Sequence, residues 1–520
     1  MSARSMSRPP LLLRRPTRAS PTTWDLKRDL GVRQLGPQEL NIVSIVQSVT
    51  KYAVMVTDPA TIRYHLEKAV YLARSGRKGP VWIDIPLDVQ ASFVNSEDLA
   101  RFDPGETLKS SAESDVKAEV AHAIELINSA ERPLILAGNG IRTAGARPAF
   151  IRFLEARPIP VLTTWMGTDL LYESHPCFFG KPGTVAPRGA NFILQNCDLL
   201  VAVGARLDFA VTGFDQSKCA RNAKKIVVDI DPAEIGKLSL GGVRPVVADA
   251  KAFLDELWNQ RETLRSRDLG SWFTRCGQWR SRFPIVLPEH RQQSQYVSTY
   301  FLGEVLAEAL TSDDLIIPGS SGAGIDRFWL SFQVKPEQRL FSTGGLGAMG
   351  FGVPAALGGC LASGRKRTIS IDGDGGFQMN IQELETIARL NLPIKFFVLN
   401  NQGYASIRGS QRNYFKRMVA CDKASGLTLP DVTRVAAAYG IKSLRISEPG
   451  SLRRQVCEVL QTPGPVVCDV MTDPEEVTQP RVSSAVRADG SMVSRPLEDL
   501  FPFLDREELR ANMIVPILED

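Results

Sequence analysis

The stretch TISIDGDGGFQMNIQELETIARLNLPIKFFVLNNQGY, residues 368–404, decides the fold of this 520-residue chain. Its first residues, Thr368–Ile371, form a β-branched run that predicts a buried strand. The glycine- and aspartate-rich residues 372–376 end that strand. A second apolar run, Lys395–Leu399, predicts another strand. Two strands joined by a helical segment are expected to lie parallel with a right-handed crossover, which indicates an α/β fold.

The segment between these strands predicts the crossover helix. Asn380 is followed three residues later by Glu383, which is a capping-box pattern typical of a helix start. Leu384 and Ile387 then recur at helical spacing. Pro393 cannot continue a helix, so we expect the helix to end before it.

Two polar clusters follow the two strands, and parallel strands bring their carboxyl ends to one edge of a sheet. Asp374 and Asn401 offer a carboxylate and an amide oxygen there, and Gly403 adds a backbone carbonyl. This set of oxygens suits Mg²⁺, which completes its octahedron with phosphate and water. Gly375 and Gly376 leave backbone amides that suit a diphosphate. The alternative is an Asp/Gly turn and an Asn/Gly turn in an ordinary α/β domain.

The two clusters together resemble the signature of the thiamine diphosphate (ThDP) enzymes, in which GDG is followed further along by NN. Gly373-Asp374-Gly375 and Asn400-Asn401 match it. The resemblance implies ThDP and Mg²⁺ as cofactors, with Asp374, Asn401 and Gly403 as metal ligands.

A glycine-rich segment, GGLGAMGFGVPAA at residues 344–356, precedes another predicted helix and indicates close backbone approach. It is similar to the family segment that meets the pyrimidine ring. The resemblance implies that the Gly347 carbonyl faces the ring's amino group and that Met349 wedges between the two rings, although a lone Met is more often core filler. The implied cofactor-binding residues are Gly347, Met349, Gly373, Asp374, Gly375, Gly376, Asn401, Gly403 and Tyr404.

Composition is that of an ordinary globular chain, with 43% hydrophobic and 23% charged residues and a net charge of +5. No basic stripe interleaved with aromatic residues indicates nucleic acid, and no apolar run indicates a membrane span. The 8 Cys show no C-x-x-C pair, which argues against zinc and disulfides. We therefore expect a cytoplasmic protein.

The expected fold class is α/β, a three-domain ThDP-enzyme architecture of doubly wound parallel sheets with an incomplete first domain. The expected segments are a disordered or atypical N-terminus (1–24), the C-terminal part of a pyrimidine-binding domain (25–95), a linker (96–114), a central Rossmann-like domain (115–262), a linker (263–295), a diphosphate-binding domain (296–472) and a C-terminal tail (473–520). We expect the tail to be partly disordered, with residues 496–505 docking on the surface.

Residues 31–90 resemble the end of the pyrimidine-binding domain of acetolactate-synthase-type enzymes. In that family, earlier residues carry a glutamate that contacts the cofactor, whereas here an Arg- and Pro-rich lead stands before the match. The catalytic residue is therefore unknown. This leaves open a truncated chain that binds cofactor without activity, a subunit that depends on a partner, or a misplaced start.

The central domain alternates predicted strands and helices, and Gly138-Asn139-Gly140 forms half of a dinucleotide fingerprint, with Thr143 where the third glycine would stand. A tight strand-to-helix turn is the alternative reading. Acetolactate synthases hold FAD in this domain, whereas many relatives leave it empty, and both possibilities stay open. The residues that would hold FAD are Gly138, Asn139, Gly140, Thr163, Met166, Gly167, Arg206, Asp229 and Ile230.

The resemblance implies a carboligase that decarboxylates a pyruvate-type 2-oxo acid and condenses the product with a second carbonyl compound. The four histidines lie at 65, 122, 175 and 290, outside the third domain, which favours carboligation over simple protonation. Residues 318–324 and 403–409 depart from the acetolactate-forming pattern, so the acceptor stays open. Family sites form between two subunits, so we expect a homodimer or homotetramer acting on a small molecule.

Overall fold

The computed structural model describes residues 30–34, 40–107, 114–265, 268–293, 295–319, 322–486 and 492–518. The chain divides into two compact units, Met1–Glu113 and Ser114–Asp520. The expected N-terminal segment 1–24 and part of the linker 96–114 fall outside the described residues. None of the described helices has the length and apolar character needed to cross a membrane.

The first unit contains a two-stranded parallel sheet, in which β1 (Tyr52–Met55) pairs with β2 (Val81–Asp84). The connecting helix α3 (Ile62–Arg74) follows a short turn capped by Asp58, whose side chain accepts a hydrogen bond from Ala60 N. The sequence predicts a helix that begins at Asp58-Pro59 and runs through Ser75, and a strand at residues 81–86, and both are observed. The described part of this unit also contains the short α-helices α2 (Ile42–Val46) and α4 (Leu87–Gln90).

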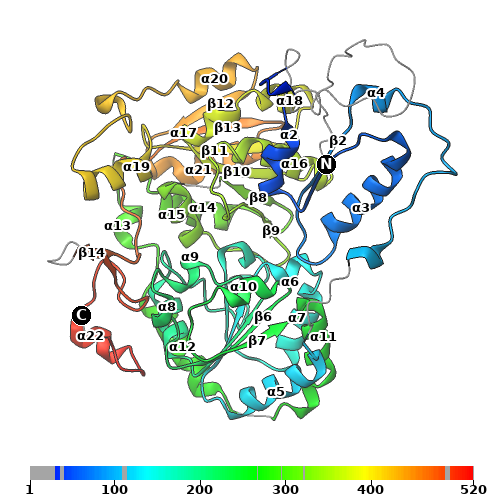
Figure 1. Ribbon diagram of the computed structural model, residues 1–520. Coiled ribbons are helices and arrows are strands. Elements are labelled where there is room, and N and C mark those ends of the chain that lie inside the picture. The colour runs from blue at the N-terminus through cyan, green and yellow to red at the C-terminus, as the bar shows by residue number, and fades with distance from the viewer. Residues whose placement is uncertain are drawn as a thin grey trace. The chain divides into compact units, whose positions relative to one another are not determined.

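The central domain is a five-stranded parallel sheet with strand order β4-β3-β5-β6-β7. Its strands are β3 (Pro133–Ala137), β4 (Val161–Thr163), β5 (Leu199–Val203), β6 (Lys224–Asp229) and β7 (Val243–Val247). One face packs on α5 (Val116–Ser129), α7 (Arg147–Ala156) and α11 (Ala250–Asn259), and the other on α8 (Arg188–Asn196) and α12 (Gly270–Arg282) (Figure 1). The sequence predicts four of the five strands, at residues 134–137, 160–163, 199–203 and 226–230. The edge strand β7 was missed because Pro245 and exposed neighbours hide its pattern, as is usual for edge strands.

The C-terminal domain is a six-stranded parallel sheet with strand order β12-β13-β11-β10-β8-β9. Its strands are β8 (Leu315–Pro318), β9 (Arg339–Leu340), β10 (Thr368–Gly373), β11 (Ile394–Asn400), β12 (Lys442–Ile446) and β13 (Val466–Met471). Helices α14 (Thr299–Ala309), α15 (Ala323–Ser331) and α21 (Leu452–Gln461) cover one face, and α16 (Gly352–Ala362), α18 (Glu383–Arg389) and α20 (Val432–Ala438) cover the other (Figure 1). The predicted α/β class with doubly wound parallel sheets is confirmed.

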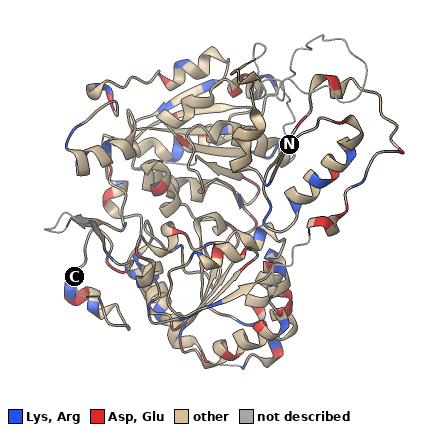
Figure 2. Ribbon diagram, in the orientation of Figure 1, with Lys and Arg blue, Asp and Glu red and all other residues tan. Residues whose placement is uncertain are grey.

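Short helices occupy several of the connections. They are α6 (Gly140–Thr143), α9 (Phe209–Thr212), α10 (Pro232–Gly236), α13 (Pro288–Arg291), α17 (Asp374–Phe377), α19 (Ala405–Ser410) and α22 (Arg506–Ala511). Along the described ribbon, positions of Lys and Arg alternate with positions of Asp and Glu (Figure 2).

The predicted capping box at Asn380 is wrong. The chain turns helical at once after β10, in α17, and α18 begins at Glu383 without a side-chain cap. The Asn380 side chain instead donates to the Gly350 carbonyl at 2.8 Å. The side chain thus binds a distant backbone carbonyl instead of accepting a hydrogen bond from the backbone N–H of Glu383, as a capping box requires.

The expectation that the C-terminal tail is partly disordered stays a prediction, since residues 487–491 and 519–520 lie outside the described residues. The expected docking of residues 496–505 is confirmed. Leu497 and Leu500 are buried in or beside the core that α8 and α12 form. Asn191 of α8 donates to the Leu497 carbonyl at 2.8 Å, and Trp279 of α12 donates to Asn512 at 3.0 Å. Sequence alone did not show these partners because they lie some three hundred residues away.

Candidate functional site

The two polar turns meet at the carboxyl edge of the C-terminal sheet. Strands β10 and β11 pair in parallel with Gly373 beside Leu399, so Asp374 and Asn401 follow the ends of neighbouring strands. Gly403 N donates to Asp374 Oδ2 at 3.0 Å, and Gly375 N donates to Asp374 Oδ1 at 2.9 Å. The structure thus joins both halves of the predicted site through one carboxylate.

The oxygens of this site are buried. Asp374 is 2% exposed and Asn401 is 6% exposed. Asn401 Oδ1 has no hydrogen-bond partner among the described residues, which is unusual for a buried polar atom. Burial raises the pKa of Asp374 to about 7, and a neighbouring cation would favour its charged form.

These observations fit a hard cation. A carboxylate and an otherwise unsatisfied amide oxygen are ligands that Mg²⁺ accepts, with the remaining positions left to phosphate and water. The part of the chain that is described contains no cluster of three or more His, Cys, Asp or Glu that would bind a metal without such help. The residues present therefore suit a metal that is held jointly with a phosphate-bearing ligand.

The turn after β11 has a backbone that few residues adopt. Gln402 has φ of 61° and Gly403 has φ of 148°. A Cβ atom at Gly403 would lie 2.2 Å from the Cys421 carbonyl oxygen, so only glycine fits. Buried Arg408 supports the turn by donating to the Asn401 carbonyl at 3.1 Å.

The glycines after β10 are required by close packing. A Cβ at Gly375 would lie 2.2 Å from the ring of Tyr404, and one at Gly376 would lie 2.6 Å from Asp372 Oδ1. The Gly375 amide already donates to Asp374, so it is less free for a diphosphate than the sequence suggested. Tyr404 thereby packs directly on the first turn of the site.

Asp372 is a residue that the sequence reading missed. It is 5% exposed, and Cβ atoms at Gly319 and Gly352 would each lie 2.4 Å from its carboxylate oxygens. Burial raises its pKa to about 7. The only signal in the sequence was an aspartate beside several glycines, which also describes an exposed turn.

The glycine-rich segment lies at the same edge of the sheet. Gly347 and Gly350 have φ of 59° and 84°, and the Gly350 carbonyl is bound by Asn380. Met349 is 40% exposed and Leu346 is 93% exposed. The alternative of Met349 as core filler is therefore excluded, and its role as a wedge stays a prediction.

In the central domain, Gly138-Asn139-Gly140, which resembles half of a dinucleotide fingerprint, forms a tight turn that packs against the backbone of Gly204. Cβ atoms at Gly138 and Gly140 would lie 2.0 and 2.6 Å from atoms of Gly204, and one at Gly167 would lie 2.9 Å from the Ala137 carbonyl oxygen. Packing alone thus explains these glycines. The alternative reading of the sequence, a strand-to-helix turn, accounts for them without a nucleotide.

The other residues proposed for FAD lie along the carboxyl edge of the central sheet. Thr163 Oγ1 is buried without a partner among the described residues, Arg206 pairs with Glu234 at 3.6 Å, and Asp229 accepts from Asp231 N at 3.0 Å. Asn139 and Ile230 stand in loops at that edge, and Met166 lies in the short 3₁₀ helix Trp165–Gly167 that follows β4. They do not form a continuous set of unsatisfied polar groups.

Replacing Gly138 with alanine is expected to destabilise the protein by about 3 kcal/mol or more, since overpacking against backbone cannot be relieved by a side-chain rotation. The midpoint of denaturant-induced unfolding measures this. The matched control is Gly277→Ala in α12, where a Cβ would meet nothing within 4 Å. It should stabilise the helix by up to about 1 kcal/mol. Equal effects of the two changes would contradict the packing explanation.

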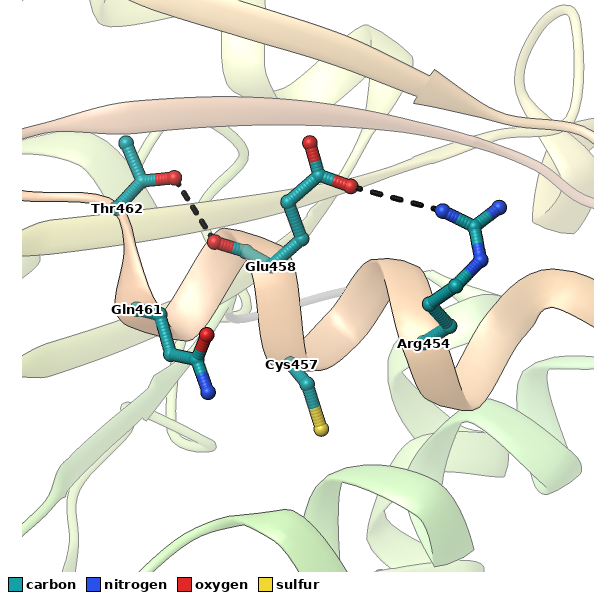
Figure 3. A pocket seen from close by; sticks show the side chains of 5 residues that line it. All are labelled: Arg454, Cys457, Glu458, Gln461 and Thr462. Carbon is teal, nitrogen blue, oxygen red and sulfur yellow. Dashed lines mark hydrogen bonds and ion pairs between the residues drawn. The ribbon is translucent and has the colours of Figure 1, made fainter.

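A hollow of about 420 Å³ lies elsewhere, on α21 (Figure 3). It is lined by Arg454, Cys457, Glu458, Gln461 and Thr462. Arg454 and Glu458 form a 3.9 Å ion pair whose side chains are 74% and 61% exposed. The hollow therefore lacks the buried charge that distinguishes the site at β10 and β11.

Comparison with known proteins places these features in a family. Residues 120–257 match the thiamine pyrophosphate enzyme central domain, and residues 320–470 match the C-terminal TPP binding domain, TPP being another name for ThDP. A probable acetolactate synthase large subunit of Methanocaldococcus jannaschii is 32% identical over 451 residues, covering 84% of this chain and 74% of the relative. The chloroplastic acetolactate synthase 1 of Zea mays is 33% identical over 463 residues, covering 86% and 70%. The chain therefore belongs to the thiamine pyrophosphate enzymes and, among them, to the family of acetolactate synthase large subunits.

Proposed function

We propose that this chain is a ThDP- and Mg²⁺-dependent carboligase, which decarboxylates a pyruvate-type 2-oxo acid and joins the remaining carbons to a second carbonyl compound. The observation that carries the proposal is the joined pair of turns at β10 and β11. There, buried Asp374 and the unsatisfied Asn401 oxygen lie within the part of the chain that matches a TPP binding domain. The relatives named acetolactate synthase support the reaction class.

Asp374, Asn401 and Gly403 would hold the metal, and through it the diphosphate. When bound, ThDP supplies the nucleophilic carbon and the electron sink for decarboxylation. The residues of the chain bind and orient the cofactor, and they exclude water from the site. The burial of Asp374 and Asn401 shields their oxygens from bulk solvent, and the positive φ of Gly347 is a backbone conformation that glycine adopts without strain.

We further propose that the chain acts as a homodimer or homotetramer. Large apolar side chains are exposed around the glycine-rich segment and α19, namely Leu346, Met349, Ile407, Tyr414 and Phe415. Large exposed apolar patches often mark interaction surfaces. A second subunit that covers them would also close the cofactor site against water.

The test is the consumption of pyruvate by the purified chain with ThDP and magnesium, with carbon dioxide and any ligated product followed together. We expect turnover with a ligated product. Light scattering should give the molar mass of a dimer or a tetramer. If the central domain holds FAD, the same sample should also show visible flavin absorbance. ThDP binding without turnover would contradict the proposal. It would favour the alternative of a cofactor-binding chain that is inactive or that depends on a partner.

A further inference from the structure

Asn400 precedes the proposed ligand Asn401, and both the nitrogen and the oxygen of its side-chain amide form hydrogen bonds. Its Nδ2 donates to Asp469 Oδ1 at 3.0 Å, and its Oδ1 accepts from Gln402 N at 3.2 Å. The second bond closes the turn in which Gln402 has φ of 61°. The Asn400 side chain therefore braces the backbone that carries Asn401 and Gly403.

The orientation of this amide is set by Asp469. An ionised carboxylate only accepts hydrogen bonds, so the NH₂ end of Asn400 must face it. The oxygen end is then forced toward the Gln402 N–H. Asp469 lies on β13, directly beside β11, and is fully buried at 0% exposed. Because Asp469 can only accept a hydrogen bond, it fixes the orientation of the Asn400 amide, and that orientation places the amide oxygen where it accepts from Gln402 N in the turn.

The charge of Asp469 is balanced from the next strand. Arg445 of β12 donates from Nε to Asp469 Oδ2 at 2.7 Å and from Nη2 to Asp431 Oδ2 at 2.7 Å. Asp431 is in turn fixed at the start of α20, where its Oδ1 accepts from Thr433 N at 2.9 Å and from Arg434 N at 3.0 Å. The hydrogen bonds and ion pairs form a continuous row from the sheet edge to Asn400.

We propose that Asp469 and Arg445 are positioning residues of the metal site, which hold the Asn401–Gly403 turn in its cation-binding shape through the amide of Asn400. This inference rests on the proposed function, since it assumes that Asn401 and Gly403 bind the metal. It adds two residues that touch neither metal nor cofactor. The row from Asp431 to Asn400 crosses three neighbouring strands, β12, β13 and β11.

The test compares Arg445→Met with a matched control in the same sheet. Arg367 and Asp314 form a similar pair, with Arg367 Nε 2.6 Å from Asp314 Oδ1, and Asp314 is 2% exposed. That pair lies where β8 and β10 begin, at the amino edge of the sheet and away from the turns. Arg367→Met thus removes an equivalent buried pair without touching the row.

The concentration of magnesium that gives half-maximal ThDP binding is measured by calorimetry for each full-length variant. We expect it to rise about 10- to 100-fold in Arg445→Met, as for other residues that orient metal ligands. In Arg367→Met we expect a change of less than about 2-fold, with a comparable loss in melting temperature. The conservative variants Arg445→Lys and Arg367→Lys should show the same difference in magnesium requirement, but a smaller one. They replace the methionine variants in the comparison if either of those fails to fold.

An equal rise in both variants, or no rise in either, would overturn the inference, because the row would then contribute only stability. The unaltered chain separates this result from a failure of the proposed function. If it bound ThDP without dependence on magnesium, the metal assignment itself would be wrong, and the positioning role would fall with it.

Discussion

Asp374→Asn is expected to weaken magnesium-dependent ThDP binding by about 100-fold or more, since residues that merely orient metal ligands already contribute 10- to 100-fold. The variant keeps the shape of the side chain and one oxygen that can accept the hydrogen bond from Gly403 N. It removes the negative charge that attracts the cation. Calorimetric titration of ThDP at several magnesium concentrations measures the effect.

The same titration with magnesium chelated gives the reference value. The Asp374→Asn variant at high magnesium should bind ThDP no better than the unaltered chain does after chelation. Asp313→Asn is the control, because Asp313 belongs to the same domain and its side chain is 92% exposed in a 3.5 Å pair with Lys366. Unchanged binding in Asp374→Asn would show that the metal is held elsewhere.

Arg327→Met is expected to lower the free energy of unfolding by about 3–5 kcal/mol, because it leaves a buried carboxylate without its cation. Arg327 of α15 lies 2.9 Å from Glu476, and their side chains are 1% and 5% exposed. Glu476 also accepts from Ser298 Oγ at 2.6 Å and from Thr299 N at 3.1 Å, at the start of α14. Denaturant-induced unfolding followed by circular dichroism measures the loss.

Two companion variants make this result specific. Arg327→Met combined with Glu476→Leu should recover much of the loss, since replacing a whole buried pair with apolar side chains is often close to neutral. Arg454→Ala, which removes the exposed pair drawn in Figure 3, should change stability by less than about 1 kcal/mol. A double variant as unstable as Arg327→Met alone would mean that the charge is not the cause.

The sequence predicted those elements whose signal is local. Strands β10 and β11 each carry a continuous apolar pattern, and their predicted positions are close to those observed. The pairing of Asp374 with the turn after β11 also followed, because a right-handed crossover leaves little choice of arrangement. Strand order, by contrast, was not predicted.

The rest of the site depends on contacts that no local pattern contains. The glycines at 319 and 352 make room for Asp372, and the amide of Asn400 is set by a residue on a strand that follows much later. Asn380 was assigned to a helix cap because its true acceptor, Gly350, lies thirty residues earlier. A single sequence gives the residue types of such partners but not which of them meet.

The docking of the C-terminal segment on α8 has a consequence for synthesis. Asn191, Gln195 and Asn196 find acceptors or donors in residues 497–515, and Arg221 finds its buried anion in Glu498. These contacts cannot form while the ribosome translates the following three hundred codons, although Asn191, Gln195 and Asn196 also bind groups of the central domain itself. The domain in the middle of the chain thus completes its core last, after the domain that follows it, and a nascent chain stalled before residue 497 should still be sensitive to protease at α8.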